Sequence, residues 1–365
     1  MTSTRYILID VREFGEARLT GIGRVLKGLV SALAETDVAE EILLATRDTH
    51  SLPFRLKTRS NMKFIELPSP FLKSERALSE LTRNNVDLFI SPYPKLPLFG
   101  CHARAAHIIH DILDLNHPAY KKRLKVHFDT WRLKKALRRA DMTWYDSVWS
   151  QKETRKFAGN VGRRPRVRYP GIDVAFSAEK SADDAAALKK YGLDPGYVLV
   201  IGNGLPHKNL GVLLNVAKHI SRKLLFVGVQ EKNRSYWKPL YPNETATWIS
   251  HVEDGDLPSL LRSAFCLAQP STAEGYGYPP LEAMACGVPA VVSNIPVLLE
   301  TTGSVALHAD PHEPRSWIES INALAREEMR RAQVEKGLNW VEPLKGIKGW
   351  QKHISDIQEL LEGRS

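Results

Sequence analysis

The run from Glu274 to Pro289 holds a dense set of residues that could bind a ligand, and it reads EGYGYPPLEAMACGVP. Gly275 and Gly277 can let backbone amides approach a ligand, and Pro279-Pro280 suits the first turn of a helix. The free N–H groups and the positive dipole end of such a helix attract a diphosphate. A shorter EGxG would indicate a helix cap with an ordinary Gly/Pro turn, whereas the whole run predicts an anion-binding loop.

The two carboxylates of this run suit different parts of a nucleotide sugar. Glu282 is expected in the first turn of the helix, where a carboxylate can accept hydrogen bonds from ribose hydroxyls. Glu274 precedes the loop, where a carboxylate can hold the hydroxyls of a sugar. Tyr276 and Tyr278 stand between them and are further candidate ligand contacts in this run.

A second segment, residues 198–210, reads VLVIGNGLPHKNL. A strand is predicted to end at Gly202, and Lys208 then stands at the mouth of the next helix, where a lysine can meet a diphosphate as a point charge. Asn203 lies in the same loop and is a further predicted donor contact. A surface lysine in a strand–helix loop is the alternative, and the presence of the Glu274 run downstream favours the phosphate contact.

Two segments of the first half could also meet a substrate. Gly21 and Gly23 permit close approach to a ligand, and Arg24 is available either for a phosphate or for pairing with a neighbouring carboxylate. The third glycine of a GxGxxG pattern is replaced by Leu26, which argues against a dinucleotide site. His110-Asp111 closes a predicted strand, where a histidine is either structural or functional.

Together these segments resemble glycosyltransferase family 4, which consists of retaining enzymes with the GT-B fold. The Glu274 run is similar to the E-x7-E motif of that family. The glycine-rich loop before the first helix and the His110-Asp111 dipeptide are also similar to the family pattern, although family members often carry an arginine at the position of Asn203. Further similar segments are Leu257–Ala264, Gln269–Ser271, Ser293–Glu300 and Ala309–Pro311.

The resemblance implies an α/β protein of two Rossmann-like doubly wound domains that face a central cleft, the first meeting the acceptor and the second the nucleotide sugar. It implies transfer of a hexose to an acceptor hydroxyl with retention at the anomeric carbon. His110, Lys208 and Glu274 would then be catalytic, with Lys208 and the amides of the glycine loop stabilising the departing diphosphate. Gly23 would be a donor contact, and Arg24 and Asp111 would be acceptor contacts.

No DxD sequence follows a predicted strand, so we expect neither a metal ion nor another cofactor. The sequence His207–Asn209 resembles family members that act in bacterial surface-polysaccharide assembly, and mannose or a deoxyhexose is the preferred sugar. The acceptor would be a glycan or a lipid-linked glycan. A nucleotide-sugar epimerase with the same fold is the alternative. A nucleic-acid-binding protein is less favoured, because the sequence has no aromatic-rich RNP-like strand and no helix-turn-helix pattern.

Short β-branched or aromatic runs alternate with helical patterns along the chain. This alternation favours parallel sheets with crossover helices, which would position the residues named above. Helices are predicted over 23–35, 209–219, 257–264 and 281–286. Strands are predicted over 6–10, 41–45, 63–67, 87–91, 107–110, 143–145 and 166–169, and again over 197–201, 224–229, 247–250, 265–269 and 290–293. The domain boundary is expected after Tyr169-Pro170-Gly171, which gives domains 1–172 and 173–345. A last helix, 346–365, could cross back to the first domain on a stripe of Trp350, Ile354, Ile357 and Leu361.

The composition, 43% hydrophobic and 25% charged, is that of a globular protein. No apolar run approaches the ~20 residues of a membrane span. The first ten residues do not resemble a secretory signal, and three widely spaced cysteines indicate a reducing compartment. We therefore expect a cytoplasmic protein.

The net charge of +10 is concentrated in the first half, where residues 121–168 hold 16 Lys/Arg against 4 Asp/Glu. A helix over 121–140 would have a core face of Val126, Leu133, Ala136, Leu137 and Ala140. A second stripe would consist of Leu124, Phe128 and Trp131, flanked by Arg123, Lys135, Arg138 and Arg139. Such a helix suits a peripheral anchor on an anionic membrane, at the inner face of the plasma membrane. In the alternative, Phe128 and Trp131 pack under a neighbouring helix.

Overall fold

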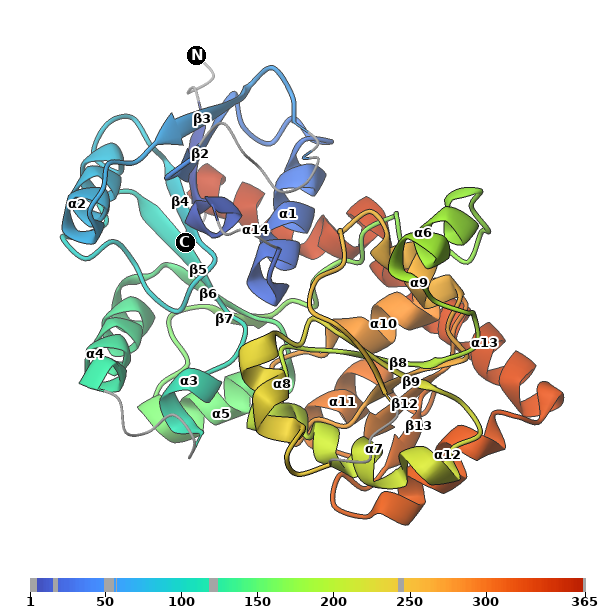
Figure 1. The fold of residues 1–365 in the computed structure, drawn as a ribbon. Coiled ribbons are helices and arrows are strands. Elements are labelled where there is room, and N and C mark those ends of the chain that lie inside the picture. The colour runs from blue at the N-terminus through green and yellow to red at the C-terminus, as the bar shows by residue number, and fades with distance from the viewer. Residues whose placement is uncertain are drawn as a thin grey trace. The chain divides into compact units, whose positions relative to one another are not determined.

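The structure is a computed structural model that describes residues 5–15, 19–48, 56, 58–117, 124–241 and 246–363. The chain forms two compact units. Unit 1 consists of residues 1–171 and 346–365, and unit 2 of residues 172–345. Each unit is a parallel sheet covered by helices, as Figure 1 shows.

The sheet of unit 1 has seven parallel strands in the order β3-β2-β1-β4-β5-β6-β7. Its strands are β1 (Tyr6–Asp10), β2 (Glu41–Thr46), β3 (Met62–Glu66), β4 (Leu88–Ser91), β5 (Arg104–Ile109), β6 (Met142–Tyr145) and β7 (Pro165–Val167). The helices are α1 (Gly21–Leu33), α2 (Phe71–Leu81), α3 (Leu113–Asn116), α4 (Leu124–Arg139), α5 (Val148–Ala158) and α14 (Gln351–Glu362), with short 3-10 turns at Arg12–Gly15 and Gly346–Trp350. Ile7, Leu8 and Ile9 are all buried because helices cover both faces of the sheet.

The sheet of unit 2 has six parallel strands in the order β10-β9-β8-β11-β12-β13. Its strands are β8 (Val198–Ile201), β9 (Leu224–Val227), β10 (Thr247–Ile249), β11 (Cys266–Gln269), β12 (Ala290–Ser293) and β13 (Leu307–Ala309). The helices are α6 (Asp183–Tyr191), α7 (Leu210–Val216), α8 (Glu231–Trp237), α9 (Leu257–Arg262), α10 (Tyr278–Ala285), α11 (Pro296–Thr302), α12 (Pro314–Ala323) and α13 (Glu327–Val341), with 3-10 turns at Pro206–Lys208, Ala217–His219 and Glu342–Leu344. This strand order and that of unit 1 are Rossmann-like, so the predicted fold class is confirmed.

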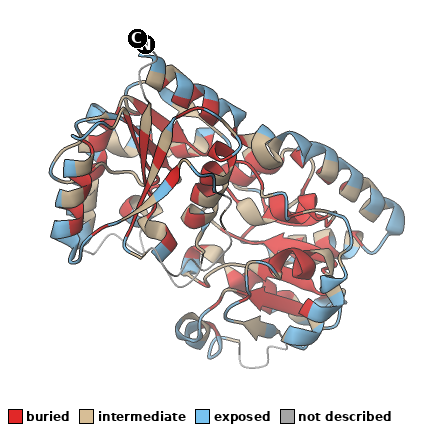
Figure 2. Cartoon of the chain, turned by 90° about the horizontal axis from the view of Figure 1, so that it is seen from above, coloured by how far each residue is buried: buried red, intermediate tan, exposed pale blue. Residues whose placement is uncertain are grey.

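The C-terminal helix α14 packs on unit 1, as the sequence predicted. Trp350, which precedes it, lies against α1 so closely that a Cβ atom on Gly28 would come within 2.5 Å of the indole. The indole of Trp144 donates a hydrogen bond of 2.9 Å to Asp356 of α14. One position of the predicted stripe is wrong, because Leu360 is buried and Leu361 is only half-buried. Figure 2 shows the buried cores of both units in red.

Element boundaries differ from the predictions where side chains outside the periodic pattern decide them. Helix α1 begins at Gly21, two residues earlier than predicted, because Thr20 caps it by accepting a hydrogen bond from the Gly23 amide at 3.1 Å. Strand β13 was not predicted. It has three residues, of which Leu307 and His308 are only half-buried, and so it carries almost no apolar pattern. No helix among the described residues is long and apolar enough to cross a membrane.

Candidate functional site

The glycine loop of unit 2 lies between the carboxyl end of β11 and helix α10. Gly277 is the residue before α10 and has a φ of 91°, which favours glycine. A Cβ atom there would come within 2.5 Å of Leu298, so the loop has no room for a side chain at this position. Pro279 and Pro280 occupy the first turn of α10, where the missing N–H groups cost no helical hydrogen bond. The predicted loop-and-helix geometry is therefore present.

Glu274 and Lys208 form an ion pair beside this loop. The Lys208 ammonium donates to the Glu274 carboxylate at 2.7 Å, and the side chains are only 17% and 10% exposed. The same carboxylate oxygen accepts hydrogen bonds from the Gln269 amide at 2.5 Å and from the Ser271 hydroxyl at 2.6 Å. Burial acts to raise the pKa of Glu274, but Lys208 and Ser271 hold that pKa below its usual value. The pair is therefore ionised.

Lys208 comes from the loop that follows β8, the strand next to β11. Asn209 has a left-handed backbone, with φ of 51°. Its side-chain amide donates to the carbonyls of Pro270 and Pro311, at 3.0 and 2.7 Å. The amide of Thr272 donates to the His207 carbonyl at 2.8 Å. The loop of Lys208 and the loop of Glu274 are thus held to each other by backbone contacts, independently of the ion pair.

Glu282 lies one helical turn later than predicted, and Asn203 makes a contact within its own loop. Glu282 is the fifth residue of α10, so it stands in the second turn and is 1% exposed. The prediction placed the helix start too late, because Tyr278, Pro279 and Pro280 are themselves helical. The side-chain oxygen of Asn203 accepts the amide of Leu205 at 3.1 Å and so stabilises its own loop.

The remaining residues of the loop are close-packed. The rings of Tyr276 and Tyr278 meet edge to face with centroids 5.3 Å apart. Tyr276 and Gly275 are buried, whereas Tyr278 is half-buried. The structure thus brings Lys208, Glu274 and the glycine loop together at the carboxyl edge of one sheet, where ligands of doubly wound proteins bind.

In unit 1, the predicted glycine-rich loop is the first turn of α1. The Thr20 hydroxyl donates to Glu13 at 2.5 Å, and the Tyr93 hydroxyl donates to the other Glu13 oxygen at 2.8 Å. Gly23 is buried, and Arg24 is half-buried. This network fixes the amino end of α1 beside the segment that follows β4.

His110 follows the last residue of β5, and both of its ring nitrogens have partners. Nδ1 lies 2.6 Å from a carboxylate oxygen of Asp146, and Nε2 lies 2.9 Å from the Pro92 carbonyl. Because both partners can only accept, both nitrogens donate and the imidazole carries a positive charge. Burial acts to lower the pKa of His110, but the charge and hydrogen bond of Asp146 raise it above its usual value.

Asp146 was not predicted as a site residue. It follows β6, which pairs with β5 in parallel, so the residues after the two strands meet at one edge of the sheet. Asp111 accepts the amide of Leu113, the first residue of the short helix α3, at 2.9 Å. The unpredicted partners could have been found from their positions in the sequence. Asp146 follows a strand directly, and Gln269 and Ser271 precede Glu274 by five and three residues.

The structure describes only part of the basic segment of residues 121–168, and some of its arginines are held in ion pairs. Residues 121–123 lie outside the described residues, and Leu124 lies outside the described side chains. Arg132 is 4% exposed and paired with Glu75 at 2.7 Å, while Arg166 and Arg168 pair with Asp356 of α14 at 2.6 and 2.7 Å. Carboxylates of α2 and α14 therefore neutralise these three arginines of the segment.

The outer face of α4 remains as predicted. Phe128 and Trp131 are 41% and 45% exposed, and their rings stack with centroids 5.9 Å apart. The Lys135 ammonium lies 5.0 Å from the Trp131 ring, and exposed Lys134, Arg138 and Arg139 follow on the same helix. Leu133, Ala136, Leu137 and Ala140 are buried as predicted, and Val126 is half-buried.

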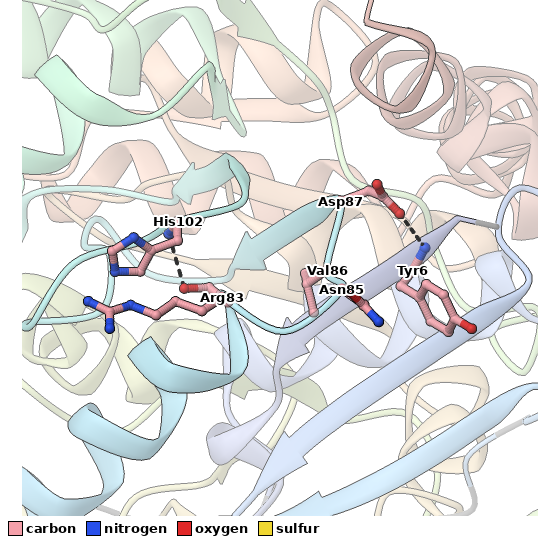
Figure 3. A pocket seen from close by; sticks show the side chains of 7 residues that line it. Tyr6, Arg83, Asn85, Val86, Asp87 and His102 are labelled. Carbon is pink, nitrogen blue, oxygen red and sulfur yellow. Dashed lines mark hydrogen bonds between the residues drawn. The ribbon is translucent and has the colours of Figure 1, made fainter. Parts of the chain in front are cut away.

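A surface pocket of unit 1 lies at the opposite edge of the sheet from His110 (Figure 3). It includes Tyr6 and Asp87 at the amino ends of β1 and β4, where the Asp87 carboxylate accepts the Tyr6 amide at 2.8 Å. Its position at the amino ends of the strands separates it from the predicted site residues. Among the described residues, no group of three or more His, Cys, Asp or Glu side chains could hold a metal ion.

Comparison with known proteins agrees with this geometry. Residues 184–340 match the family described as glycosyl transferases group 1. This stretch contains Lys208, the Glu274 run and Glu282. Over this stretch, most of unit 2, the chain is similar to that family. Over 324 residues it is 28% identical to O-antigen chain mannosyltransferase B of Escherichia coli, a match that covers 81% of this chain and 84% of that protein.

A second relative is similar over a shorter stretch. O-antigen chain mannosyltransferase RfbU of Salmonella typhimurium is 32% identical over 168 residues, which cover 44% of this chain and 46% of that protein. Among solved structures, sucrose-phosphate synthase of Thermosynechococcus elongatus superposes with a TM-score of 0.76 at 18% identity, over 98% of each chain. HepE of Anabaena in complex with UDP-glucose gives 0.74 at 16% identity, over 96% of this chain and 98% of that one. At these identities the likeness shows the fold alone, which is the GT-B fold.

Proposed function

We propose that the protein is a glycosyltransferase that moves a hexose from a nucleoside diphosphate to a hydroxyl of a glycan or lipid-linked acceptor, with retention at the anomeric carbon. Mannose is the preferred sugar, because the two relatives described above are mannosyltransferases by name. A deoxyhexose is the second choice. Both relatives are named for O-antigen chains, which supports a role in surface-polysaccharide synthesis. Neither name favours an epimerase or a nucleic-acid-binding protein.

The observation that carries the proposal is the Lys208–Glu274 pair beside the amino end of α10. The leaving diphosphate gains negative charge in the transition state, and a lysine and a helix amino end can stabilise that charge without rearranging. Glu274 keeps two other hydrogen-bond donors, Gln269 and Ser271, so Lys208 can turn to the diphosphate without leaving the carboxylate bare. The other carboxylate oxygen of Glu274, to which none of these three groups donates, can then accept from sugar hydroxyls.

The experiment that tests this function is a screen of nucleotide sugars by thermal stabilisation, followed by transfer from the best donor. A ligand at 100 times its Kd stabilises the protein by about 2.7 kcal/mol. We expect GDP-mannose or a nucleoside-diphosphate deoxyhexose to raise the melting temperature most, and the anomeric coupling in the product to show retention. An inverted product would exclude the retaining mechanism, and stabilisation by none of the nucleotide sugars would contradict the donor class.

We propose further that the outer face of α4 binds the cytoplasmic surface of an anionic membrane, which would suit a lipid-linked acceptor. Exposed Phe128 and Trp131 can enter the headgroup region, and each nearby lysine or arginine adds ~1 kcal/mol of attraction. The double variant Phe128→Ser, Trp131→Ser should fold and lose binding to phosphatidylglycerol vesicles. Tyr236→Ser, at a 56% exposed aromatic of unit 2, is the control and should bind as the wild type does. Unchanged binding of the double variant would refute the anchor.

A further inference from the structure

The segment that joins β4 to β5 in unit 1 is held rigidly at the carboxyl end of β4. Three prolines, Pro92, Pro94 and Pro97, restrict its backbone. Glu75 of α2 accepts the Leu98 amide at 2.9 Å, and Arg132 of α4 donates to the Leu96 carbonyl at 2.8 Å. Since His110 also donates to Pro92, contacts on both sides fix this loop, Ser91 to Gly100.

This loop presents one lysine. Lys95 is half-buried, and its ammonium lies 4.6 Å from the centroid of the Tyr93 ring. The ring is fixed because the Tyr93 hydroxyl donates to Glu13 at 2.8 Å. The side chain of Lys95 is thereby laid over a rigid aromatic surface beside the network at the amino end of α1, which includes Thr20 and Glu13.

The carboxylates around Lys95 are already engaged by other groups. Arg12 forms ion pairs with Asp10 at 2.7 Å and with one carboxylate oxygen of Glu75 at 2.9 Å. Arg132 takes the other oxygen of Glu75 at 2.7 Å, and Glu13 accepts from two hydroxyls. Among the residues that the structure describes, none forms an ion pair with Lys95. Burial and the neighbouring charge of Arg132 lower the pKa of Lys95, so the site stabilises the ammonium less well than water does.

We propose that Lys95 binds an oxyanion carried by the acceptor. A half-buried cation without a carboxylate partner, on a rigid loop at the carboxyl edge of the sheet, gains most from an anionic ligand. The oxyanion is either a phosphate that links the acceptor glycan to a lipid or the carboxylate of an acidic sugar. The inference rests on the proposed function, since it assigns the acceptor to unit 1.

The test uses inorganic pyrophosphate, inorganic phosphate and glucuronate as probes, titrated calorimetrically into the full chain. Three variants are compared with the wild type. Lys95→Met removes the charge but keeps the length of the side chain over Tyr93. Lys208→Met removes the expected donor contact of unit 2, and Lys352→Met is a control at an exposed lysine of α14. Unchanged far-ultraviolet circular dichroism establishes that each variant is folded.

We expect Lys95→Met to weaken binding at one class of sites at least tenfold, and Lys352→Met to leave the titration unchanged. If Lys95→Met weakens binding of pyrophosphate and phosphate, the acceptor carries a phosphate. If it weakens binding of glucuronate, the acceptor carries an acidic sugar. If Lys95→Met binds all three probes with the affinity of the wild type, the proposal is overturned. If Lys208→Met alone leaves pyrophosphate binding unchanged, the donor site assumed under the proposed function fails while the site at Lys95 stands.

Discussion

Each unit holds an ion pair between loops that follow neighbouring parallel strands, and the two pairs are built differently. In unit 2, Lys208 and Glu274 meet at 2.7 Å after β8 and β11. In unit 1, His110 and Asp146 meet at 2.6 Å after β5 and β6. The lysine is a flexible point charge whose partner has other hydrogen-bond donors, whereas the imidazole has both nitrogens engaged inside its own unit. The first pair can exchange partners for a ligand, and the second is suited to holding a loop.

The largest expected effect comes from removing the exchangeable charge. Lys208→Ala should lower turnover by ~10²–10³-fold, the scale for loss of one electrostatic stabiliser of developing charge. The fold should survive, because Gln269 and Ser271 still donate to Glu274. Steady-state kinetics with the donor identified by the screen would measure the loss.

A double variant separates this role from a structural one. Lys208→Met with Glu274→Gln replaces the ion pair by neutral groups of similar size, so the melting temperature should stay near that of the wild type while turnover remains low. Near-normal turnover in either folded variant would remove Lys208 from the mechanism. Lys352→Ala, at an exposed lysine of α14 in unit 1, is the matched control and should retain full turnover.

Breaking the His110–Asp146 pair of unit 1 should lower the free energy of unfolding more than loss of Lys208 does. Asp146→Asn keeps the shape of the side chain but removes the charge that holds His110 protonated. Loss of one partner of a buried pair costs ~3 kcal/mol or more of unfolding free energy. Asp146 is 2% exposed, so little solvent screening reduces this figure.

The pH dependence of this loss has a definite sign. The pKa of His110 is higher in the folded protein than the ~6.5 of an unperturbed histidine. The stabilisation is therefore fully present below about pH 6.5 and is lost as the pH rises through the folded pKa. Urea unfolding of the wild type and of Asp146→Asn should differ most at pH 6 and converge at high pH. A difference that is constant with pH would show that His110 is not protonated.

The strands and the donor loop could be predicted from the sequence because their signals are local. The apolar runs of β1 and β12 match the predicted ranges at both ends, and the glycines of the Glu274 run mark backbone positions where a side chain would collide. The pairing of Lys208 with Glu274 was not predicted, because the residues are 66 positions apart and each was assigned to a different part of the donor.

In unit 1 fewer side-chain contacts could be predicted, because they join segments that are distant in the sequence and carry no motif. Asp146 lies 36 positions from His110, and Arg166 is neutralised by Asp356, 190 positions away. Charge counted along the sequence therefore overestimated the basic surface. Whether His110 and Asp111 face a substrate stays a prediction.

A smaller effect distinguishes the two carboxylates of the E-x7-E run. Glu282→Ala should weaken binding of the bare nucleoside diphosphate by ~10-fold, about the free energy of one hydrogen bond to a charged group. Glu274→Ala should leave that affinity nearly unchanged and impair transfer of the sugar. Calorimetry on both variants gives the affinities. Equal nucleotide affinity of Glu282→Ala and the wild type would contradict the ribose assignment.

The smallest expected effect is that of chelation, which should leave turnover unchanged. A diphosphate needs positive charge around it, and in unit 2 that charge can come from Lys208 and from the amino end of α10, which is equivalent to about half an elementary charge. Glu274 is taken up by Lys208, Gln269 and Ser271 and is thus a poor candidate for a metal ligand. Turnover in excess EDTA should equal that without it, for the wild type and for Lys352→Ala alike. Loss of turnover that magnesium or manganese restores would show instead that a cation completes the donor site and that Lys208 does not suffice for the leaving group.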